Sequence, residues 1–179
     1  MAQESIYKQY KPSLIFILKF AGIYLLLSIL YNFYLSSQIG HTDSLSLLVG
    51  KALNATYHLF AINAQLIPLD NEAGLKLIIN GQYLARIVEG CTAMSVIIMF
   101  ISFVISFGNS FYKAFKFALI GSVLIFIFNI LRILILSYIL YYFPKYQDIA
   151  HRVLFPALIY GFVVFLWFIF IKKILKNDK

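Results

Sequence analysis

The sequence predicts an all-α integral membrane protein with about four transmembrane helices, a short extracytoplasmic amphipathic helix and a β-hairpin. Three observations predict this class. First, 62% of the 179 residues are hydrophobic and 12% are charged, whereas a soluble domain has about 45–50% apolar and about 25% charged residues. Second, the apolar residues form long runs. Third, basic residues cluster between those runs, as they do beside membrane helices. The composition excludes a soluble enzyme, a disordered chain and a nucleic-acid-binding module.

Four apolar runs approach the length of about 20 residues that a membrane-spanning helix needs. They cover residues 13–34, 91–107, 118–143 and 151–171, and the second is short. The first run is longer than the apolar core of a signal peptide, which has roughly 7–15 residues, and no Ala-x-Ala pattern follows it. We therefore expect a retained anchor there, within a single membrane domain over residues 1–179.

The distribution of basic residues predicts the orientation, because lysine and arginine are enriched on the cytoplasmic side of a membrane. We expect both termini and the 108–117 loop to be cytoplasmic, and residues 36–90 and the 144–150 link to lie outside. The cytoplasmic side then collects most of the basic residues, namely Lys8, Lys11, Lys113, Lys116, Lys172, Lys173, Lys176 and Lys179.

The outer segment is expected to have structure of its own. Between Ser44 and Phe60 apolar residues recur near one helical face, which predicts an amphipathic helix on the membrane surface. These residues are Leu45, Leu48, Val49, Ala52, Thr56, Leu59 and Phe60. Farther on, two β-prone runs flank Asn80-Gly81, a dipeptide typical of a two-residue hairpin turn. This hairpin leads directly into Glu89-Gly90-Cys91.

Arg132 lies within the third predicted span, where a charged side chain costs about 2.5–3.5 kcal/mol to insert. Arginine stays charged in proteins, and no acidic residue nearby in the sequence neutralises it. Asn129, three residues earlier, lies on the same helical face. Two interpretations stay open. Arg132 is either a structural clamp for backbone carbonyls or lipid headgroups, or it forms an anion or oxyanion site that faces the bundle interior.

Cys91 is the single cysteine of the chain. It opens the second predicted span at the outer face, where the helix dipole favours a thiolate, although an ionised Glu89 nearby would oppose it. His151 opens the fourth predicted span at the same face. Taken alone, Cys91 is also explained as a packing residue and His151 as a polar residue at the membrane interface. His41 and His58 are competing candidates for the functional histidine.

The three side chains are predicted to lie at similar depths in the membrane. At about 1.5 Å per residue, Cys91, Arg132 and His151 lie about 24, 21 and 30 Å above the inner ends of their predicted spans. In a hydrocarbon core about 30 Å thick, all three fall in the outer third.

A thiol, an imidazole and a guanidinium at one membrane face indicate acyl transfer. The imidazole would take the thiol proton and later protonate the leaving amine, and the guanidinium would stabilise the oxyanion. Asn129 could orient either partner. Water would release the thioester product, or an amine or hydroxyl acceptor would capture it. No His, Asp or Glu pair with metal-ligand spacing lies on a span, so neither a metal site nor a cofactor is expected.

These residues resemble the exosortase and archaeosortase family of membrane transpeptidases. The resemblance rests on Glu89-Gly90-Cys91-Thr92 opening one span, Asn129-x-x-Arg132 in the next and His151 opening the last, and it covers about residues 75–171. It implies a cysteine protease or transpeptidase in the bacterial cytoplasmic membrane, with its active site facing outward. The implied catalytic residues are Cys91, Arg132 and His151, supported by Asn129 and Glu89.

The resemblance also implies the partners. The family's substrates are exported proteins whose C-terminal sorting signal has a short motif, a spanning helix and a basic cluster. The basic cluster would remain in the cytoplasm, and the motif would then lie at the outer face of the membrane. A surface glycan or a lipid is a candidate acceptor, and no nucleic acid is expected. The chain is similar to the small exosortase F branch, but Thr92-Ala93 stands where many relatives have a Ser/Thr-Gly pair.

A function of another class stays open, namely a non-catalytic membrane subunit or a small anion-handling transporter that binds through Arg132. The sequence has no internal repeat, whereas alternating-access transporters usually have paired halves. Such a role needs Arg132 but not the thiol of Cys91, so variants of these two residues separate the hypotheses.

Overall fold

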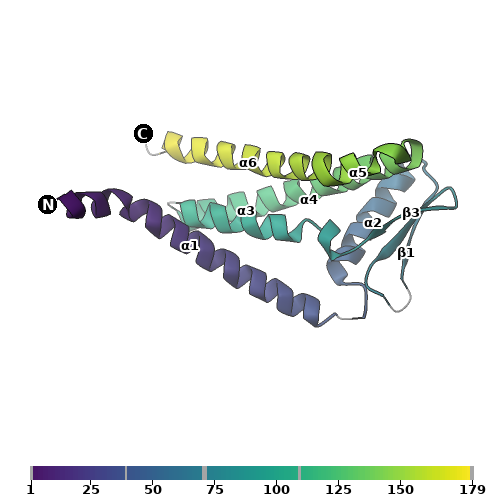
Figure 1. The fold of residues 1–179 in the computed structure, drawn as a ribbon, viewed down its shortest axis with the longest axis horizontal. Helices are drawn as coiled ribbons and strands as arrows, with labels where there is room; N and C mark the ends of the chain where they lie inside the picture. Colours follow the sequence, from purple (N-terminus) through teal and green to yellow (C-terminus); the bar gives the residue numbers. More distant parts are fainter. Residues whose placement is uncertain (1, 39, 70–71, 109, 178–179) are drawn as a thin grey trace.

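The structure, a computed structural model, describes residues 2–38, 40–69, 72–108 and 110–177. This part of the chain is mostly helical, with one small sheet (Figure 1). The long helices are α1 (Ala2–Ser36), α3 (Met94–Phe107), α4 (Phe111–Tyr142) and α6 (Phe155–Asn177). The sheet and α2 (Ser44–Leu59) lie together at one end of the molecule, and both chain termini lie at the other.

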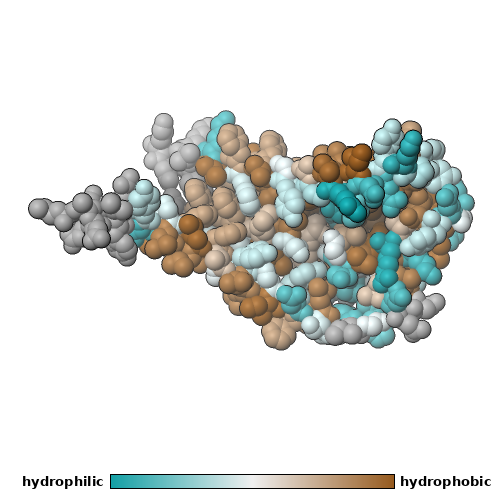
Figure 2. Space-filling model, viewed as in Figure 1, coloured by the Kyte–Doolittle hydropathy of each residue, from teal (hydrophilic) through white to brown (hydrophobic). Residues whose placement is uncertain are grey.

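Three helical stretches of the described chain are long and apolar enough to cross a membrane, which indicates a membrane protein. They are Tyr10–Ser36, Phe111–Tyr142 and Pro144–Lys173. The second predicted span corresponds to α3, which is apolar but has only 14 residues. Its length of about 21 Å is shorter than a hydrocarbon core of about 30 Å. Apolar side chains gather over the helices, and polar ones are more frequent toward the end that carries the sheet (Figure 2).

Several predicted boundaries were wrong. α3 begins at Met94 rather than at Cys91, and α4 begins at Phe111 rather than at residue 118. The predicted 108–117 loop is therefore mostly helix, since Lys113 and Lys116 lie in the first turns of α4. The predicted 144–150 link is also helical. It contains the 3₁₀ turn Pro144–Tyr146 and α5 (Gln147–Ile149), and the π-helical segment η3 (Ala150–Leu154) continues it into α6.

Gly108 permits the short connection between α3 and α4. A Cβ atom at this position would lie 2.6 Å from the Cβ of Ala114 and 3.1 Å from the carbonyl oxygen of Val104. Any larger residue would therefore push the first turn of α4 away from the end of α3. α3 consequently ends, and α4 begins, at the same end of the molecule, and the start of the shorter α3 lies beside the middle of α4.

The sheet contains β1 (Ala64–Pro68), β2 (Leu75–Ile79) and β3 (Gln82–Ile87), in the order β1-β2-β3. Both neighbouring pairs are antiparallel. β2 and β3 flank Asn80 and Gly81, where the Asn-Gly dipeptide predicted the turn. Both turn residues have positive φ, at 50° and 80°, as a type I′ turn requires. The strand β1 was not predicted.

The helix α2 packs onto the sheet and α4 rather than lying free. Asp43 caps it, because its carboxylate accepts hydrogen bonds from the backbone N–H groups of Leu45 and Ser46, both at 3.0 Å. Its buried face consists mainly of Val49, Leu53 and Tyr57. The predicted apolar face was therefore partly wrong, since three of its members are exposed, namely Leu48, Leu59 and Phe60.

Two apolar clusters lie along α4. The first joins α3, the N-terminal half of α4 and α6, around Phe100, Ile125 and Val163. The second joins α2, the sheet and the middle of α4. At its edge the Tyr57 hydroxyl shares a 2.6 Å hydrogen bond with Ser137. Burial raises the pKa of this hydroxyl, although the hydrogen bond opposes the shift. By contrast, α1 packs against α3, and none of its described side chains is buried.

Candidate functional site

The short turn between β3 and α3 carries Cys91. Residues Glu89–Cys91 form a 3₁₀ turn, in which the Cys91 N–H donates to the Val88 carbonyl at 2.8 Å. The next residue but one, Ala93, has a φ of 58° and caps α3. Cys91 therefore lies three residues before α3 rather than opening it. These residues connect the extended strand to the helix, which continues toward the end of the molecule where α4 begins.

Cys91, Arg132 and His151 line one cavity of about 380 Å³. They reach it from three separate elements, namely the 3₁₀ turn, α4 and the π-helical segment η3. The rest of the wall comes from β3 and from neighbouring residues of β2, α4 and α5. Its members are Leu77, Tyr83, Leu84, Ala85, Arg86, Ile87, Ile133, Leu136, Ser137, Leu140 and Gln147. The three predicted catalytic side chains thus share one cavity.

The guanidinium of Arg132 is half-buried at this cavity. Its Nε atom is fully buried and has no hydrogen-bond partner among the described residues. A buried donor without a partner costs about 1–3 kcal/mol, and more when it is charged. A structural clamp would be expected to satisfy such a donor with a backbone carbonyl. The guanidinium therefore lies at the cavity with one buried donor that the described residues leave unpaired.

Asn129 connects α4 to the turn that carries Cys91. Its side chain is fully buried, and its Nδ2 atom donates to the Cys91 carbonyl oxygen at 2.7 Å. This bond places Cys91 at the level of Asn129, one helical turn before Arg132. Asn129 thereby positions the backbone of the cysteine, whereas its buried Oδ1 atom has no partner within the described chain.

His151 is exposed and lies in the π-helical segment η3, a rare conformation that occurs frequently at functional sites. Its side chain lines the same cavity as Cys91, and Gln147 lies one turn earlier on the same wall. Within the described residues no hydrogen bond joins the imidazole to the thiol. Catalytic hydrogen bonds are often long in unliganded enzymes. The competing histidines His41 and His58 are exposed and lie outside the cavity wall.

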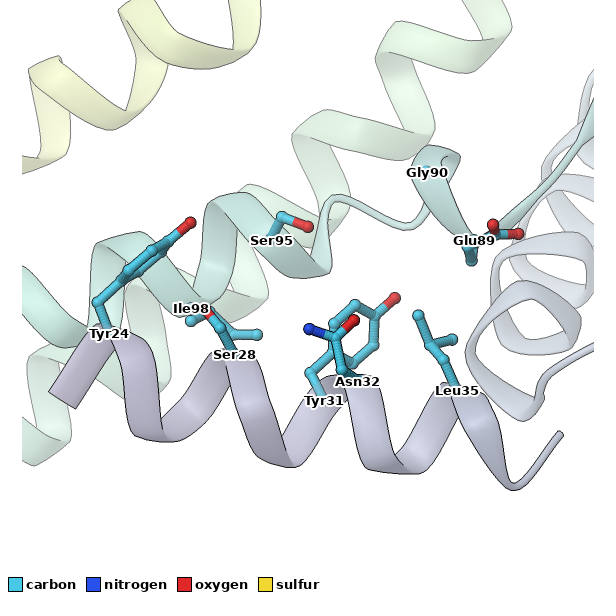
Figure 3. A pocket seen from close by; sticks show the side chains of 9 residues that line it. All are labelled: Tyr24, Ser28, Tyr31, Asn32, Leu35, Glu89, Gly90, Ser95 and Ile98. Atoms are coloured by element: carbon cyan, nitrogen blue, oxygen red, sulfur yellow. The ribbon is translucent and has the colours of Figure 1, made fainter. Parts of the chain in front are cut away.

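Glu89, the other predicted supporting residue, is not among the residues that line this cavity. It lines a second cavity of about 270 Å³ between α1 and the start of α3 (Figure 3). The physical reason is the 3₁₀ turn, which rotates by about 120° per residue and so points residues two apart to different sides. The other walls carry hydroxyl and amide groups, and the lining residues are Tyr24, Ser28, Tyr31, Asn32, Leu35, Gly90, Ser95 and Ile98.

Sequence reasoning missed the contribution of β3 and α5 to the cavity. Arg86 is a second guanidinium on its wall, but its Nη1 atom forms a 2.6 Å ion pair with Glu72 and its Nη2 atom donates to the Ala73 carbonyl. Arg86 is therefore already paired, unlike Arg132. The signal that could have indicated this wall was the position of residues 82–87 directly before Cys91.

Comparisons with protein families, with curated proteins and with solved structures find no match to this chain. Among the described residues, no group of three or more His, Cys, Asp or Glu side chains could hold a metal ion.

Proposed function

We propose that this protein is a membrane-embedded cysteine protease or transpeptidase of the exosortase type. It would cleave the C-terminal sorting signals of exported proteins at the outer face of the bacterial cytoplasmic membrane and transfer them to an acceptor. The single observation that carries this proposal is the shared cavity of Cys91, Arg132 and His151. These side chains supply the nucleophile, the oxyanion donor and the proton carrier that acyl transfer needs.

The proposed topology has four spans, formed by α1, α3, α4 and α6. The N-terminal end of α1, the turn from α3 to α4 and the C-terminal end of α6 lie at one end of the molecule, which we assign to the cytoplasm (Figure 1). Lys113, Lys116, Lys172 and Lys173 lie near that end, in agreement with the enrichment of basic residues inside. The short α3 then reaches the outer leaflet, where the 3₁₀ turn continues it.

The proposed reaction begins with His151 taking the proton of the Cys91 thiol. The thiolate attacks the carbonyl carbon of the scissile peptide, and the Arg132 guanidinium stabilises the negative oxygen that forms. The C–N bond breaks, and the imidazolium gives its proton to the leaving amine. The resulting thioester is then attacked by water, or by the amine or hydroxyl of an acceptor, and the thiol is restored.

The main alternative is a non-catalytic membrane subunit or anion-handling protein that uses Arg132 alone. The partnerless Nε atom fits that role too. However, it gives no reason for Asn129 to hold the Cys91 carbonyl at the same cavity. The two functions differ in whether the thiol is needed.

The test is to co-express the protein with exported proteins that carry a C-terminal motif, a spanning helix and a basic tail. The expected result is a size shift in one of them that disappears with Cys91→Ala. Ser95→Ala is the matched control, because it also removes one small polar group but lines the second cavity. Processing by Cys91→Ala at the level of wild type would overturn the proposal.

The orientation is tested separately with reporter fusions. A reporter at Asn63 should be exposed outside the membrane, and one joined to the C-terminus should remain in the cytoplasm. If both reporters are found on one side, the four-span topology is wrong and the cavity cannot face the exported substrates.

A further inference from the structure

The strand β3 is an edge of the sheet, and its outer edge is open. In the order β1-β2-β3 it pairs only with β2. Among the described residues, its outer edge makes no backbone hydrogen bond to another element. The opposite edge strand, β1, contains Pro68, which cannot donate a hydrogen bond, whereas β3 contains no proline. An open edge presents a row of N–H and C=O groups that fit another peptide backbone.

This edge borders the cavity of Cys91. In a strand, successive side chains point to opposite faces, so a cavity on one face contacts alternate residues only. Here residues from both faces line the cavity. Ile87 is buried and pairs with the buried Leu75, whereas Arg86 is exposed and pairs with Lys76. The cavity therefore reaches the edge of β3 as well as the face of the sheet on which Leu77 and Ala85 lie.

The direction of β3 is fixed at both ends by contacts with α4. Before the strand begins, Asn80 donates a hydrogen bond from Nδ2 to the Tyr141 hydroxyl at 3.2 Å. After it ends, the Cys91 carbonyl is held by Asn129. Tyr141 lies twelve residues beyond Asn129, or about 18 Å along the helix, and a six-residue strand spans about 20 Å. The open edge thus descends along α4 toward the nucleophile.

We propose that the edge of β3 binds the sorting motif of the substrate as an added strand, parallel to β3, and delivers the scissile peptide to Cys91. This inference rests on the proposed function and names how its site holds a substrate. The occupant is a peptide in extended form, because a row of alternating backbone donors and acceptors is matched by another backbone. The parallel direction follows because the substrate descends to Cys91 and then continues into its own membrane helix.

A bulge in β3 limits how much of the edge is regular. Leu77 pairs with Ala85 and Ile78 pairs with Tyr83, so Leu84 is an extra residue without a partner. Bulges interrupt pairing at sheet edges and are frequent near active sites. The regular stretch next to the turn is therefore Ala85–Ile87. This stretch pairs with only a few substrate residues, which suits a short motif and discourages long edge-to-edge association.

The decisive experiment replaces single backbone amides of the substrate by esters, which removes one N–H group without changing the side chain. The probe is a synthetic peptide with the motif of a tail that shows Cys91-dependent processing, presented to the protein in lipid vesicles. Esters at alternate positions upstream of the cleaved bond should raise KM about threefold to tenfold each, as expected for the loss of one hydrogen bond. Esters at the intervening positions should leave KM unchanged. Equal effects at all positions, or at none, would overturn the inference.

A second measurement is independent of turnover. A benzophenone side chain placed at Tyr83, an exposed residue on the cavity wall, should cross-link to the tail of the substrate protein in the Cys91→Ala variant. The matched control is Ile67, an exposed residue on the opposite edge strand β1, which should not cross-link. Cross-links from Tyr83 only to lipid, or to a second copy of this chain, would contradict strand addition.

The two proposals fail in different ways. If no exported protein shows Cys91-dependent processing, the proposed function fails. If processing occurs but the ester scan has no alternating pattern, the proposed function survives and the binding mode is wrong.

Discussion

Two cavities flank the turn Glu89–Cys91, and they differ in the chemistry of their walls. The cavity on the side of α4 and β3 contains a thiol, two guanidinium groups and an imidazole. The cavity on the side of α1 and α3 contains hydroxyl and amide groups and the carboxylate of Glu89 (Figure 3). A single 3₁₀ turn thus directs two polar side chains that are close in the sequence, Glu89 and Cys91, into different cavities. Motif membership alone therefore does not place a residue in the site.

The largest expected effect is that of Cys91→Ala, which should abolish processing while the protein still inserts into the membrane. Cys91→Ser should be nearly as inactive, because a hydroxyl is far harder to deprotonate than a thiol. The measurement is the size shift of the substrate, with the amount of protein in the membrane as the folding control. Full activity in either variant would remove Cys91 as the nucleophile, and loss of the protein from the membrane in both would favour a packing role.

Arg132→Lys should lower the rate of thioester formation about a hundredfold to a thousandfold, the range for loss of one oxyanion donor. Lysine keeps the charge but lacks the planar fork of donors, so it does not replace arginine at such a site. If Arg132 only anchored α4, lysine could extend to the interface nearly as well and activity would survive. Single-turnover measurement of the thioester at Cys91 checks the difference. Wild-type rates would contradict the oxyanion role.

Asn129→Leu should lower kcat about tenfold. Leucine has a similar size but cannot donate to the Cys91 carbonyl, and the carbonyl is left without its partner at a cost of about 1–3 kcal/mol. Because Asn129 acts through the backbone of Cys91, the alkylation rate of the thiol by a maleimide should change as well. An unchanged alkylation rate together with unchanged kcat would show that the hydrogen bond does not position the nucleophile.

Glu89→Gln should change activity less than twofold, because its side chain lines the second cavity. The variant removes one negative charge and keeps the shape, so it reports on electrostatic coupling between the two cavities. The processing assay with the same substrate measures it. A loss similar to that of Arg132→Lys would mean that both cavities act in one reaction.

The smallest expected effect is that of Ala93→Gly, at the end of the turn that separates the cavities. Ala93 has a φ of 58°, a left-handed conformation that glycine adopts without the steric cost of a Cβ atom. Glycine also loses more entropy on folding, and it removes a methyl group that is buried in the cluster of α3, α4 and α6. These costs should offset the relief, so stability should change by about 0.5 kcal/mol or less. Thermal unfolding in detergent measures the change, and activity should stay unchanged. A larger gain would contradict the packing role of the Cβ atom of Ala93.

Much of the site was predictable because its chemistry is carried by residues that are costly or rare in a membrane. Arg132 is a charged residue within an apolar run, Cys91 is the single cysteine, and His151 directly precedes an apolar run. Their shared level was predicted partly for a wrong reason, since α4 starts seven residues earlier than residue 118, or about 10 Å deeper. What aligns Cys91 with α4 is the hydrogen bond from Asn129, which no periodicity reveals.

The rest of the fold depends on contacts between distant segments. The strand β1 contains Pro68 and has little β-preference by itself, so it forms because β2 offers an edge for pairing. The buried face of α2 was misplaced because Tyr57 is buried against Ser137, and a tyrosine in an amphipathic pattern is equally suited to the surface. The separation of Glu89 from Cys91 arises from turn geometry. Single-sequence patterns do not contain this information.

The unequal lengths of α3 and α4 bear on the proposed acyl transfer. α3 extends about 21 Å and α4 about 48 Å from the same connection, so Cys91 sits well below the outer end of α4. Apolar side chains, among them Leu136 and Leu140, line the cavity around it. A thioester formed there would be held in a region of low water activity. Its lifetime before hydrolysis would lengthen, and an amine or hydroxyl that diffuses within the membrane would outcompete bulk water in the partition between transfer and release.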